Sequence, residues 1–502
     1  MTNKIRKAIK TRKENLLLRL MENGSVLAKP MIRTDKIKYD YSDKIQGMNF
    51  GGIGVVLTFF ENSGLVKLLD DNLNFFKIHK PYHESDHVLN LILNTLCGGE
   101  CLDDLELLRN NPAYLDALGA VRIPDPTTAG DFLRRFDEDS IMELLKINNE
   151  INQRVWKFGN IKTKKEIGII DIDGKLEKTF GECKEGIDMT YKGFWGFSNL
   201  LLTEATTGVH LYSICRPGNF LSQTDATKWI NKGIKLVSDN FLKLYLRGDS
   251  AYSLTKNFDE WDRDLVTFTF GYDAHPNIVE IAKSIENKAW KRIYRTKIEG
   301  KTLREKKQRY KEQKVIEREY LNKRLEREYV SEIEYKPGKC KNNYRLIIVK
   351  KILKVSQGYL NLGKEIRYFF YITNDREKTP EEIVKFIRER CNHENKIEQM
   401  ANGVHAMKMP VSELKANWAY MVISMMAWNI KCWLGMVNPD KDLGREMIKM
   451  EFKKFRNRII NFTTQIVKAG RQTIFRVINY HPDLEAIFKL FENIKKMEMK
   501  PG

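Results

Sequence analysis

Two aspartates stand close together in the stretch EIGIIDIDGK, residues 166–175. The residues before them are β-formers typical of a buried strand. Successive strand side chains alternate in direction, so Asp171 and Asp173 point to the same face. Two carboxylates this close repel each other, and the pKa of one rises unless a cation lies between them or the strand end stays solvated. The pair therefore indicates either a divalent-metal site or a solvated strand end.

Further carboxylates stand where they can join this pair. Asp249 follows the predicted strand LKLYLRG, and ligands of open α/β sheets bind at strand ends. A late predicted helix offers Glu389, Glu394 and Glu398. Phosphoryl transfer to DNA uses two divalent ions, and carboxylates are the ligands that Mg²⁺ prefers. These acids favour a metal-dependent site for DNA chemistry, with helix capping as the alternative role for Asp249.

A different motif points to another class of enzyme. HESDH, residues 83–87, has the spacing H-E-x-x-H, in which two histidines one helical turn apart bind zinc and the glutamate acts as base. We expect a helix to begin only at His87, which leaves His83 outside it and turns the two rings apart. A zinc metalloprotease using His83, Glu84 and His87 is therefore the remote alternative.

Composition narrows the class further. The chain has 502 residues, of which 42% are apolar, as in globular proteins. Lys and Arg number 86 against 66 acidic residues, giving a net charge of +20 that favours a polyanionic partner such as nucleic acid. No apolar run approaches the roughly 18 residues that span a bilayer, and no signal peptide is evident, so we expect a cytoplasmic protein without a membrane partner. The seven scattered cysteines indicate neither disulfides nor a structural zinc site.

Elements that position the acids follow residue 165. We expect strands at 166–173, 197–205, 209–215, 242–250 and 265–273, and helices at 223–240 and 253–263. Together they describe a mixed sheet with helical cover. Upstream, residues 51–137 have helical periodicity. Downstream, we expect a charged helix within 291–330, strands at 344–355 and 365–373, and helices from 379 and 417 onward.

In this order the motifs resemble the DDE transposases of bacterial insertion sequences. The resemblance rests on DIDG, YKGFWGF, LRGDSAY and RCNHENKIEQ, and it extends over most of the chain. Within the family it is similar to the branch whose RNase H-like core is split by an insertion domain before the final acid. It implies an α/β core with an RNase H-like mixed sheet, an inserted β-containing region, and helical N- and C-terminal regions.

The resemblance assigns the catalytic and metal-binding acids. The first falls on Asp173, with Asp171 as the alternate or a supporting ligand, and the second on Asp249. The third falls on Glu394, because the family places an arginine four residues before it and Arg390 stands there.

Departures from the family pattern bear on activity. The family's Tyr is Ile387 here, its Lys is Ala401, and Lys175 stands where Thr is usual. In relatives the Tyr and Lys position DNA phosphates. A catalytically impaired DNA-binding relative of transposases is therefore the alternative function.

The implied activity is cut-and-paste transposition. The protein is expected to bind terminal inverted repeats and target DNA as a homodimer, near the bacterial nucleoid, and to cleave and transfer strands with two Mg²⁺ ions, for which Mn²⁺ substitutes. We expect DNA contacts from basic side chains at Lys192, Arg247, Lys306, Lys307 and Arg309.

The expected regions follow from these assignments. They are a basic arm (1–45), a helical DNA-binding region (46–160), the first part of the core (161–275), an insertion with a charged helix and strands (276–365), the second part of the core with the glutamate helix (366–435), and a helical basic C-terminal region (436–502).

Overall fold

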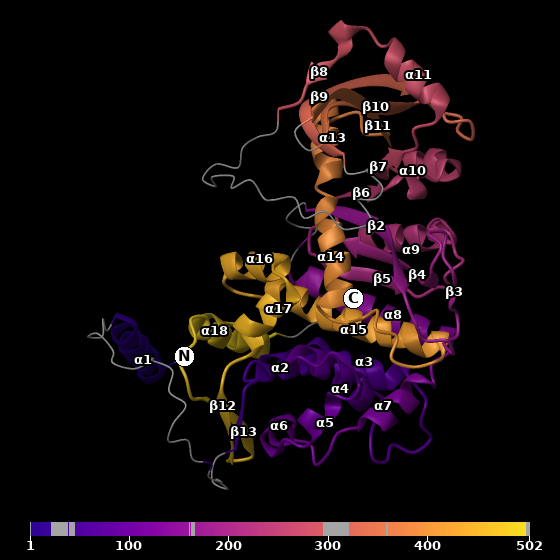
Figure 1. The fold of residues 1–502 in the computed structure, drawn as a ribbon. Coiled ribbons are helices and arrows are strands. Elements are labelled where there is room, and N and C mark those ends of the chain that lie inside the picture. The colour runs from indigo at the N-terminus through magenta and orange to yellow at the C-terminus, as the bar shows by residue number, and fades with distance from the viewer. Residues whose placement is uncertain are drawn as a thin grey trace.

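A computed structural model describes residues 2–21, 39, 46–159, 161, 166–294, 321–357 and 360–497, without the side chains of residues 391–394. The molecule is elongated. A long mixed sheet occupies the upper part of Figure 1, and most of the helices gather below it around a central helix, α15 (Leu414–Met436). No helix within the described ranges has the length and apolarity to cross a membrane.

The sheet is built on the strands predicted after residue 165, which are confirmed. In spatial order they are β5 (His210–Ile214), β4 (Trp195–Glu204), β2 (Ile167–Lys178), β6 (Lys243–Gly248) and β7 (Thr267–Tyr272). β4 runs antiparallel to both β5 and β2, whereas β2, β6 and β7 run parallel. The short β3 (Asp188–Met189) also pairs with β4. The connections carry α9 (Ala226–Ser238), η1 (Ser250–Tyr252), η2 (Thr255–Asn257) and α10 (Phe258–Arg263).

The same sheet continues through the segment predicted as an insertion. β7 pairs with β11 (Leu360–Thr373), which is followed in space by β10 (Tyr344–Gln357), β9 (Asn322–Tyr335) and β8 (Lys291–Arg292). Between β7 and β8 lie α11 (Pro276–Ser284) and η3 (Asn287–Ala289). The strands expected at 344–355 and 365–373 are therefore confirmed.

The charged helix expected within 291–330 falls mostly on residues 295–320, which lie outside the described residues, whereas the two described ends of that segment are the strands β8 and the start of β9. In β9 the mixed charges make ion pairs across the sheet, Lys323 with Glu365 at 2.6 Å and Glu332 with Arg345 at 2.6 Å. A pattern of alternating charges is compatible both with i,i+4 ion pairs on a helix and with ion pairs between strands. Here the long antiparallel pairing with β10 makes the segment from Asn322 a strand.

Two helices lead from this outer sheet back to the core. α13 (Pro380–Arg388) begins at a capping box formed by Thr379 and Glu382 and packs Ile383 and Val384 against the apolar face of β9 and β10. α14 (Cys391–Asn402) follows after a short turn, and Figure 1 shows both helices running down beside the sheet toward α15.

α15 forms the centre of the helical part, and nearly all of its residues are buried. Asn429 binds Asn148 of a second long helix, α8 (Glu138–Phe158), and the backbone of His210 on β5. Around these lie α2 (Ile53–Ser63), α3 (Leu65–Asn72), α4 (Glu84–Cys97), α5 (Leu105–Arg109), α6 (Pro112–Leu118), α7 (Pro126–Leu133), α16 (Lys441–Lys449), α17 (Phe452–Phe455), η4 (Arg456–Ile460) and α18 (Leu484–Lys495).

The two terminal regions contain elements that the sequence analysis did not specify. The segment predicted as a basic arm contains an exposed helix, α1 (Asn3–Met21). The C-terminal region predicted as helical contains a hairpin, β12 (Thr464–Ala469) and β13 (Gln472–Val477), and β12 also pairs with β1 (Gly47–Met48). Gly470 and Arg471 have φ of +57° and +61°, the conformation of a tight two-residue hairpin turn. The short apolar runs on either side resemble helix segments in periodicity, which explains the error.

Trp433 tests the central role of α15. Its ring is fully buried, stacks on Phe59 at 5.9 Å and donates to Asn152 of α8 at 2.7 Å. We expect Trp433→Ala to lower the free energy of unfolding by about 3–5 kcal/mol in denaturant titrations, because it leaves a cavity and an unpaired amide. Leu107→Ala, at a side chain that is 74% exposed, is the control and should change stability by about 0.5 kcal/mol or less.

Candidate active site

Asp171 is bound to a buried arginine. Its carboxylate accepts two hydrogen bonds from Arg247 of β6, at 2.7 Å from Nε and 2.9 Å from Nη2. The remaining nitrogen, Nη1, donates to the carbonyl of Phe386 in α13 at 2.8 Å. Arg247 is 3% exposed, so the structure places this expected DNA contact inside the protein, where it joins β2, β6 and α13. Asp171 is correspondingly neutralised by a structural partner.

Asp173 and Asp249 lie one step further along the same two strands. The parallel register ends with Asp171 opposite Arg247; continued by two residues it brings position 173 beside position 249, and the charge of Asp249 raises the pKa of Asp173. Asp249 follows β6 directly and accepts a hydrogen bond from the N–H of Ala251 at 3.0 Å. The capping role considered for Asp249 is thus present, and it fixes the carboxylate at the strand end.

Arg390 joins this pair of acids from the helix side. Its Nη1 lies 2.7 Å from Oδ2 of Asp173, and the other oxygen of Asp173 accepts the N–H of Gly174 at 2.8 Å. Burial raises the pKa of Asp173 to about 6, against the opposing effect of Arg390 and with a further increase from Asp249. Burial also raises the pKa of Asp249, again opposed by Arg390. The two carboxylates therefore lie close enough for the charge of Asp249 to affect Asp173, and the guanidinium of Arg390 affects the pKa of both.

The glutamate candidates occupy different positions around α14. Glu394 follows Arg390 by one helical turn, so both positions lie on one side of the helix; its side chain is not among the described atoms. Glu389 and Glu398 line a cavity of about 650 Å³ together with Asp171 and Arg247. Asp173 and Asp249 are not among the residues that line this cavity.

Two of the three positions that depart from the family pattern, Ile387 and Ala401, pack inward. Ile387 is 5% exposed on α13, and Ala401 of α14 packs against the main core. Neither side chain offers a polar group to a ligand. Lys192 lies exposed in the turn between β3 and β4, 5.8 Å from the ring of Tyr191. Lys306, Lys307 and Arg309 lie outside the described residues.

The donor set fits a divalent cation in its chemistry. Two anionic carboxylates with raised pKa values are brought together, and a cation between them would relieve their repulsion. Among the side chains that the structure describes, no three Asp, Glu, His or Cys groups are close enough to hold an ion. Glu394, the expected third acid, is not one of those side chains.

The HESDH motif forms a helix start. α4 begins at Glu84, three residues earlier than expected, and His83 precedes it with its N–H bound to Asp86 at 2.8 Å. The buried Glu84 accepts the N–H groups of Phe75 and Phe76 at 2.9 and 3.0 Å.

The two histidines of the motif have separate ring partners. His83 stacks on His79, whereas His87 stacks on Phe132, each with 4.4 Å between ring centroids. The geometry therefore gives the motif no common metal.

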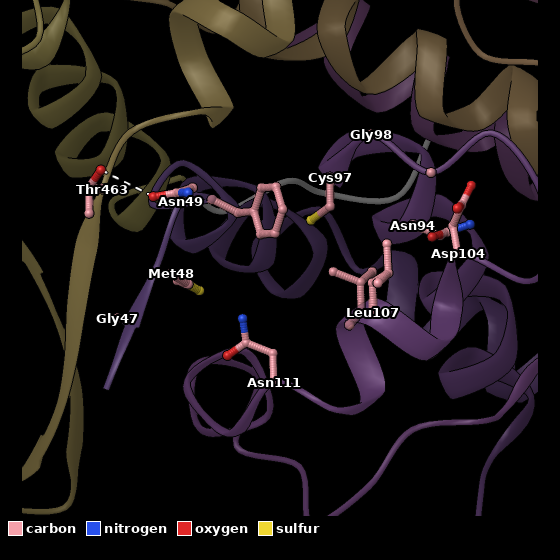
Figure 2. A pocket seen from close by; sticks show the side chains of 13 residues that line it. Gly47, Met48, Asn49, Asn94, Cys97, Gly98, Asp104, Leu107, Asn111 and Thr463 are labelled. Atoms are coloured by element: carbon pink, nitrogen blue, oxygen red, sulfur yellow. Dashed lines mark hydrogen bonds between the residues drawn. The ribbon is translucent and has the colours of Figure 1, made fainter. Parts of the chain in front are cut away.

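A separate cavity of about 410 Å³ lies beside β1, as Figure 2 shows. Amides, glycines and apolar groups line most of it, among them Asn94 and Asn111. Its one carboxylate, that of Asp104, accepts the N–H groups of Glu100 and Cys101 at 2.7 and 3.1 Å. Burial raises the pKa of the Cys97 thiol far above its usual range, so this sulfur is a poor nucleophile. The cavity carries no arrangement for catalysis.

A mixed α/β fold with acids at the ends of neighbouring parallel strands agrees with the comparison with known families. Residues 50–499 match the family described as transposase DDE domain group 1, which is most of the chain. The chain therefore belongs to this family of DDE transposases, and the predicted resemblance to DDE transposases is confirmed.

Other comparisons add little. No curated protein matches the chain. Among solved structures, the chain is similar to a piggyBac transposase in a synaptic complex with hairpin DNA, studied by cryo-electron microscopy. The identity is 12%, the match covers 82% of this chain and 81% of that chain, and the TM-score is 0.38.

His87 makes a pH-dependent contribution to stability. Burial lowers its pKa from 6.5 to about 4, so between these values the unfolded chain binds a proton that the folded protein does not. Stability is therefore lost as the pH falls through this window, by about 3 kcal/mol for this group. We expect His87→Phe to remove that part of the acid destabilisation in thermal unfolding followed across this range. His275→Phe, at an exposed position, should leave the pH dependence as it is.

The two aspartates of β2 should respond differently to removal of charge. We expect Asp171→Asn to lower the free energy of unfolding by about 3–5 kcal/mol, because it leaves Arg247 buried without its counter-charge. Asp173→Asn should leave stability unchanged or slightly higher, because it removes one of two repelling carboxylates. Denaturant titration without divalent ions measures both. Equal losses would contradict the distinction between a structural and a functional aspartate.

Proposed function

We propose that this transposase binds the terminal inverted repeats of a bacterial insertion sequence, cleaves DNA at them and transfers the freed ends to target DNA. The observation that carries the proposal is the parallel register of β2 and β6, which brings the positions of Asp173 and Asp249 together, with Asp173 bound to Arg390 at the start of the helix that contains Glu394. Paired acids at the ends of adjacent strands suit phosphoryl transfer.

The strand order supports an RNase H-like core. The five strands β5, β4, β2, β6 and β7 have three antiparallel members followed by two that are parallel to β2. On this proposal β8 to β11 belong to an insertion between the fifth strand and the glutamate helix. The insertion then extends the catalytic sheet instead of forming a separate body.

Asp173, Asp249 and Glu394 would hold two Mg²⁺ ions, for which Mn²⁺ can substitute. Bound ions supply activation of the attacking oxygen and stabilisation of the leaving oxygen. The chain itself orients the ligands. Arg390 and the N–H of Gly174 fix the two oxygens of Asp173, and the N–H of Ala251 fixes Asp249. The carboxylates are thereby held in position before DNA binds.

DNA binding follows from charge and surface. The net charge of +20 favours a polyanion, and Lys192 lies exposed near the aromatic residues Tyr191 and Trp195. The helical region 46–160, together with Lys306, Lys307 and Arg309, is proposed to contact the element ends in a homodimeric paired-end complex. The protein would act in the cytoplasm, at the nucleoid.

A catalytically impaired DNA-binding protein is the second candidate. Ile387 and Ala401 favour it, since both side chains pack inward and lack the polar groups of the family pattern. The candidate predicts DNA binding without cleavage.

Substitution of the three acids tests the site. We expect Asp173→Asn, Asp249→Asn and Glu394→Gln each to reduce Mg²⁺-dependent nicking by roughly a thousandfold, since a lost ligand removes several kcal/mol of transition-state stabilisation. DNA affinity should stay the same or rise slightly, because a repulsive charge is removed. The substrate is duplex DNA that includes the sequences flanking the reading frame, and affinity is measured by gel shift.

Glu398→Gln is the matched control, because Glu398 lies on the same helix but lines the neighbouring cavity. It should nick nearly normally. A normal nicking rate for Glu394→Gln together with loss of nicking in Glu398→Gln would show that the third acid is Glu398 and not Glu394. Parallel loss of affinity and cleavage would mean that the acids support the fold, and no cleavage by the unmodified protein would favour the second candidate.

A further inference from the structure

A cavity of about 330 Å³ lies in the helical region, between the loop 74–83, α4 and α7. Its volume is at the lower end of the roughly 300–1,000 Å³ that ligand pockets occupy. In Figure 1, α4 and α7 lie on the far side of α15 from β2 and β6, so this cavity is distinct from the candidate active site. The HESDH motif contributes His87 to its wall.

Cations at the cavity are held by aromatic rings. The guanidinium of Arg122 lies 5.9 Å from the ring centroid of Tyr82, and that of Arg135 lies 5.0 Å from that of Phe76. Lys80 also lines the cavity. Within the described part of the chain, no ion pair joins these three cations to a carboxylate. A ring orients a guanidinium without cancelling its charge, so the positive potential remains available to an anion.

The nearby carboxylates have other partners. Asp125 caps α7, accepting the N–H and hydroxyl of Thr128 at 2.8 and 2.9 Å, and these hydrogen bonds lower its pKa. Asp131 is paired with Arg134 at 2.9 Å. Arg109, which also lines the cavity, is paired with Glu106 at 3.2 Å. Asp125 stays anionic, and Lys80, Arg122 and Arg135 together exceed it, so the cavity keeps a net positive charge.

The inner wall is aromatic and has one unsatisfied polar atom. His87 is 4% exposed, and its Nδ1 is buried without a hydrogen-bond partner among the described residues. Its ring stacks on Phe132 at 4.4 Å, and Phe76 and Tyr82 each lie 5.4 Å away. A buried polar atom without a partner is costly, which points to a ligand that supplies one.

We propose that this cavity binds one nucleotide of a DNA strand. Arg122 and Arg135 hold its phosphate, and its base lies against the aromatic wall with a hydrogen bond to Nδ1 of His87. Arginine matches phosphate geometry, and bases pack on aromatic side chains without regard to sequence. The inference rests on the proposed DNA function and adds a strand contact remote from the catalytic acids.

A paired comparison of double variants tests the phosphate contact. Arg122→Ala/Arg135→Ala removes the two pocket arginines, and Arg263→Ala/Arg445→Ala removes two arginines that are 71% exposed and each paired with an aspartate elsewhere. Affinity for a random-sequence duplex and for a single-stranded oligonucleotide is measured against salt without divalent ions. We expect the pocket variant to lose affinity about tenfold and its salt slope to fall by about 1, as for one lost phosphate contact. The control should match the unmodified protein.

The base contact has its own readout. A bromouracil-substituted single strand should photocrosslink to the peptides that contain Tyr82 or His87, and the crosslink should disappear in Arg122→Ala/Arg135→Ala. His87→Phe keeps the ring stacking and removes the nitrogens, so it should weaken strand binding several-fold with no loss of thermal stability at neutral pH. Unchanged affinity in His87→Phe would overturn the assigned hydrogen bond.

The remaining outcomes distinguish failure of the proposed DNA function from failure of the nucleotide pocket alone. If the unmodified protein binds neither probe, the proposed DNA function fails. If it binds and the pocket variant equals the control, the function stands and the nucleotide pocket is refuted. Thymidine monophosphate is the competitor: displacement of the strand only at a large molar excess supports a strand site, whereas displacement at equal concentration overturns it in favour of a free nucleotide.

Discussion

The buried ion pair between Asp171 and Arg247 is the interaction on which the arrangement of the site depends. Burying two charges costs several kcal/mol per ion and is tolerated only when geometry and hydrogen bonds are complete. Here both carboxylate oxygens are used, and Arg247 also binds the Phe386 carbonyl of α13. One guanidinium thus fixes two adjacent strands and a helix more than a hundred residues later. This contact therefore fixes the positions of the ends of β2 and β6 relative to the start of α14.

The segment predicted as an insertion takes part in this arrangement. Its strands continue the central sheet from β7, and α13 packs against β9 and β10 through a small apolar cluster that includes Val330, Ile347 and Ile383. An ion pair between Arg388 and Glu328 adds to the contact at the end of α13. Because α14 begins only three residues after Arg388, the outer sheet determines where Arg390 and position 394 lie. Changes in that sheet would reach the site through α13.

The sequence predicted what depends on local pattern. Alternation along β2 put Asp171 and Asp173 on one face, and the strand end located Asp249. The sequence pattern did not show that Arg247 is the partner of Asp171. An arginine on a strand is expected to be exposed until the parallel register places it opposite an acid. The β9 strand and the β12–β13 hairpin were missed for a related reason: their short-range patterns suit a helix equally well, and long-range pairing decides.

Asp171 and Asp173 differ in the arginine that each of them binds. Asp171 is neutralised by a bidentate arginine and stabilises the strands, whereas Asp173 shares Arg390 with Asp249 and keeps a raised pKa. Carboxylates held together at this cost are typical of functional sites, because a fold selected only for stability would separate them. The pair of Asp171 and Arg247 joins β2 to β6 next to the two acids, and it thereby opposes the separation that repulsion between Asp173 and Asp249 favours. A separation of two residues is the shortest that places both side chains, Asp171 in its ion pair and Asp173 at the acid site, on the same face of a strand.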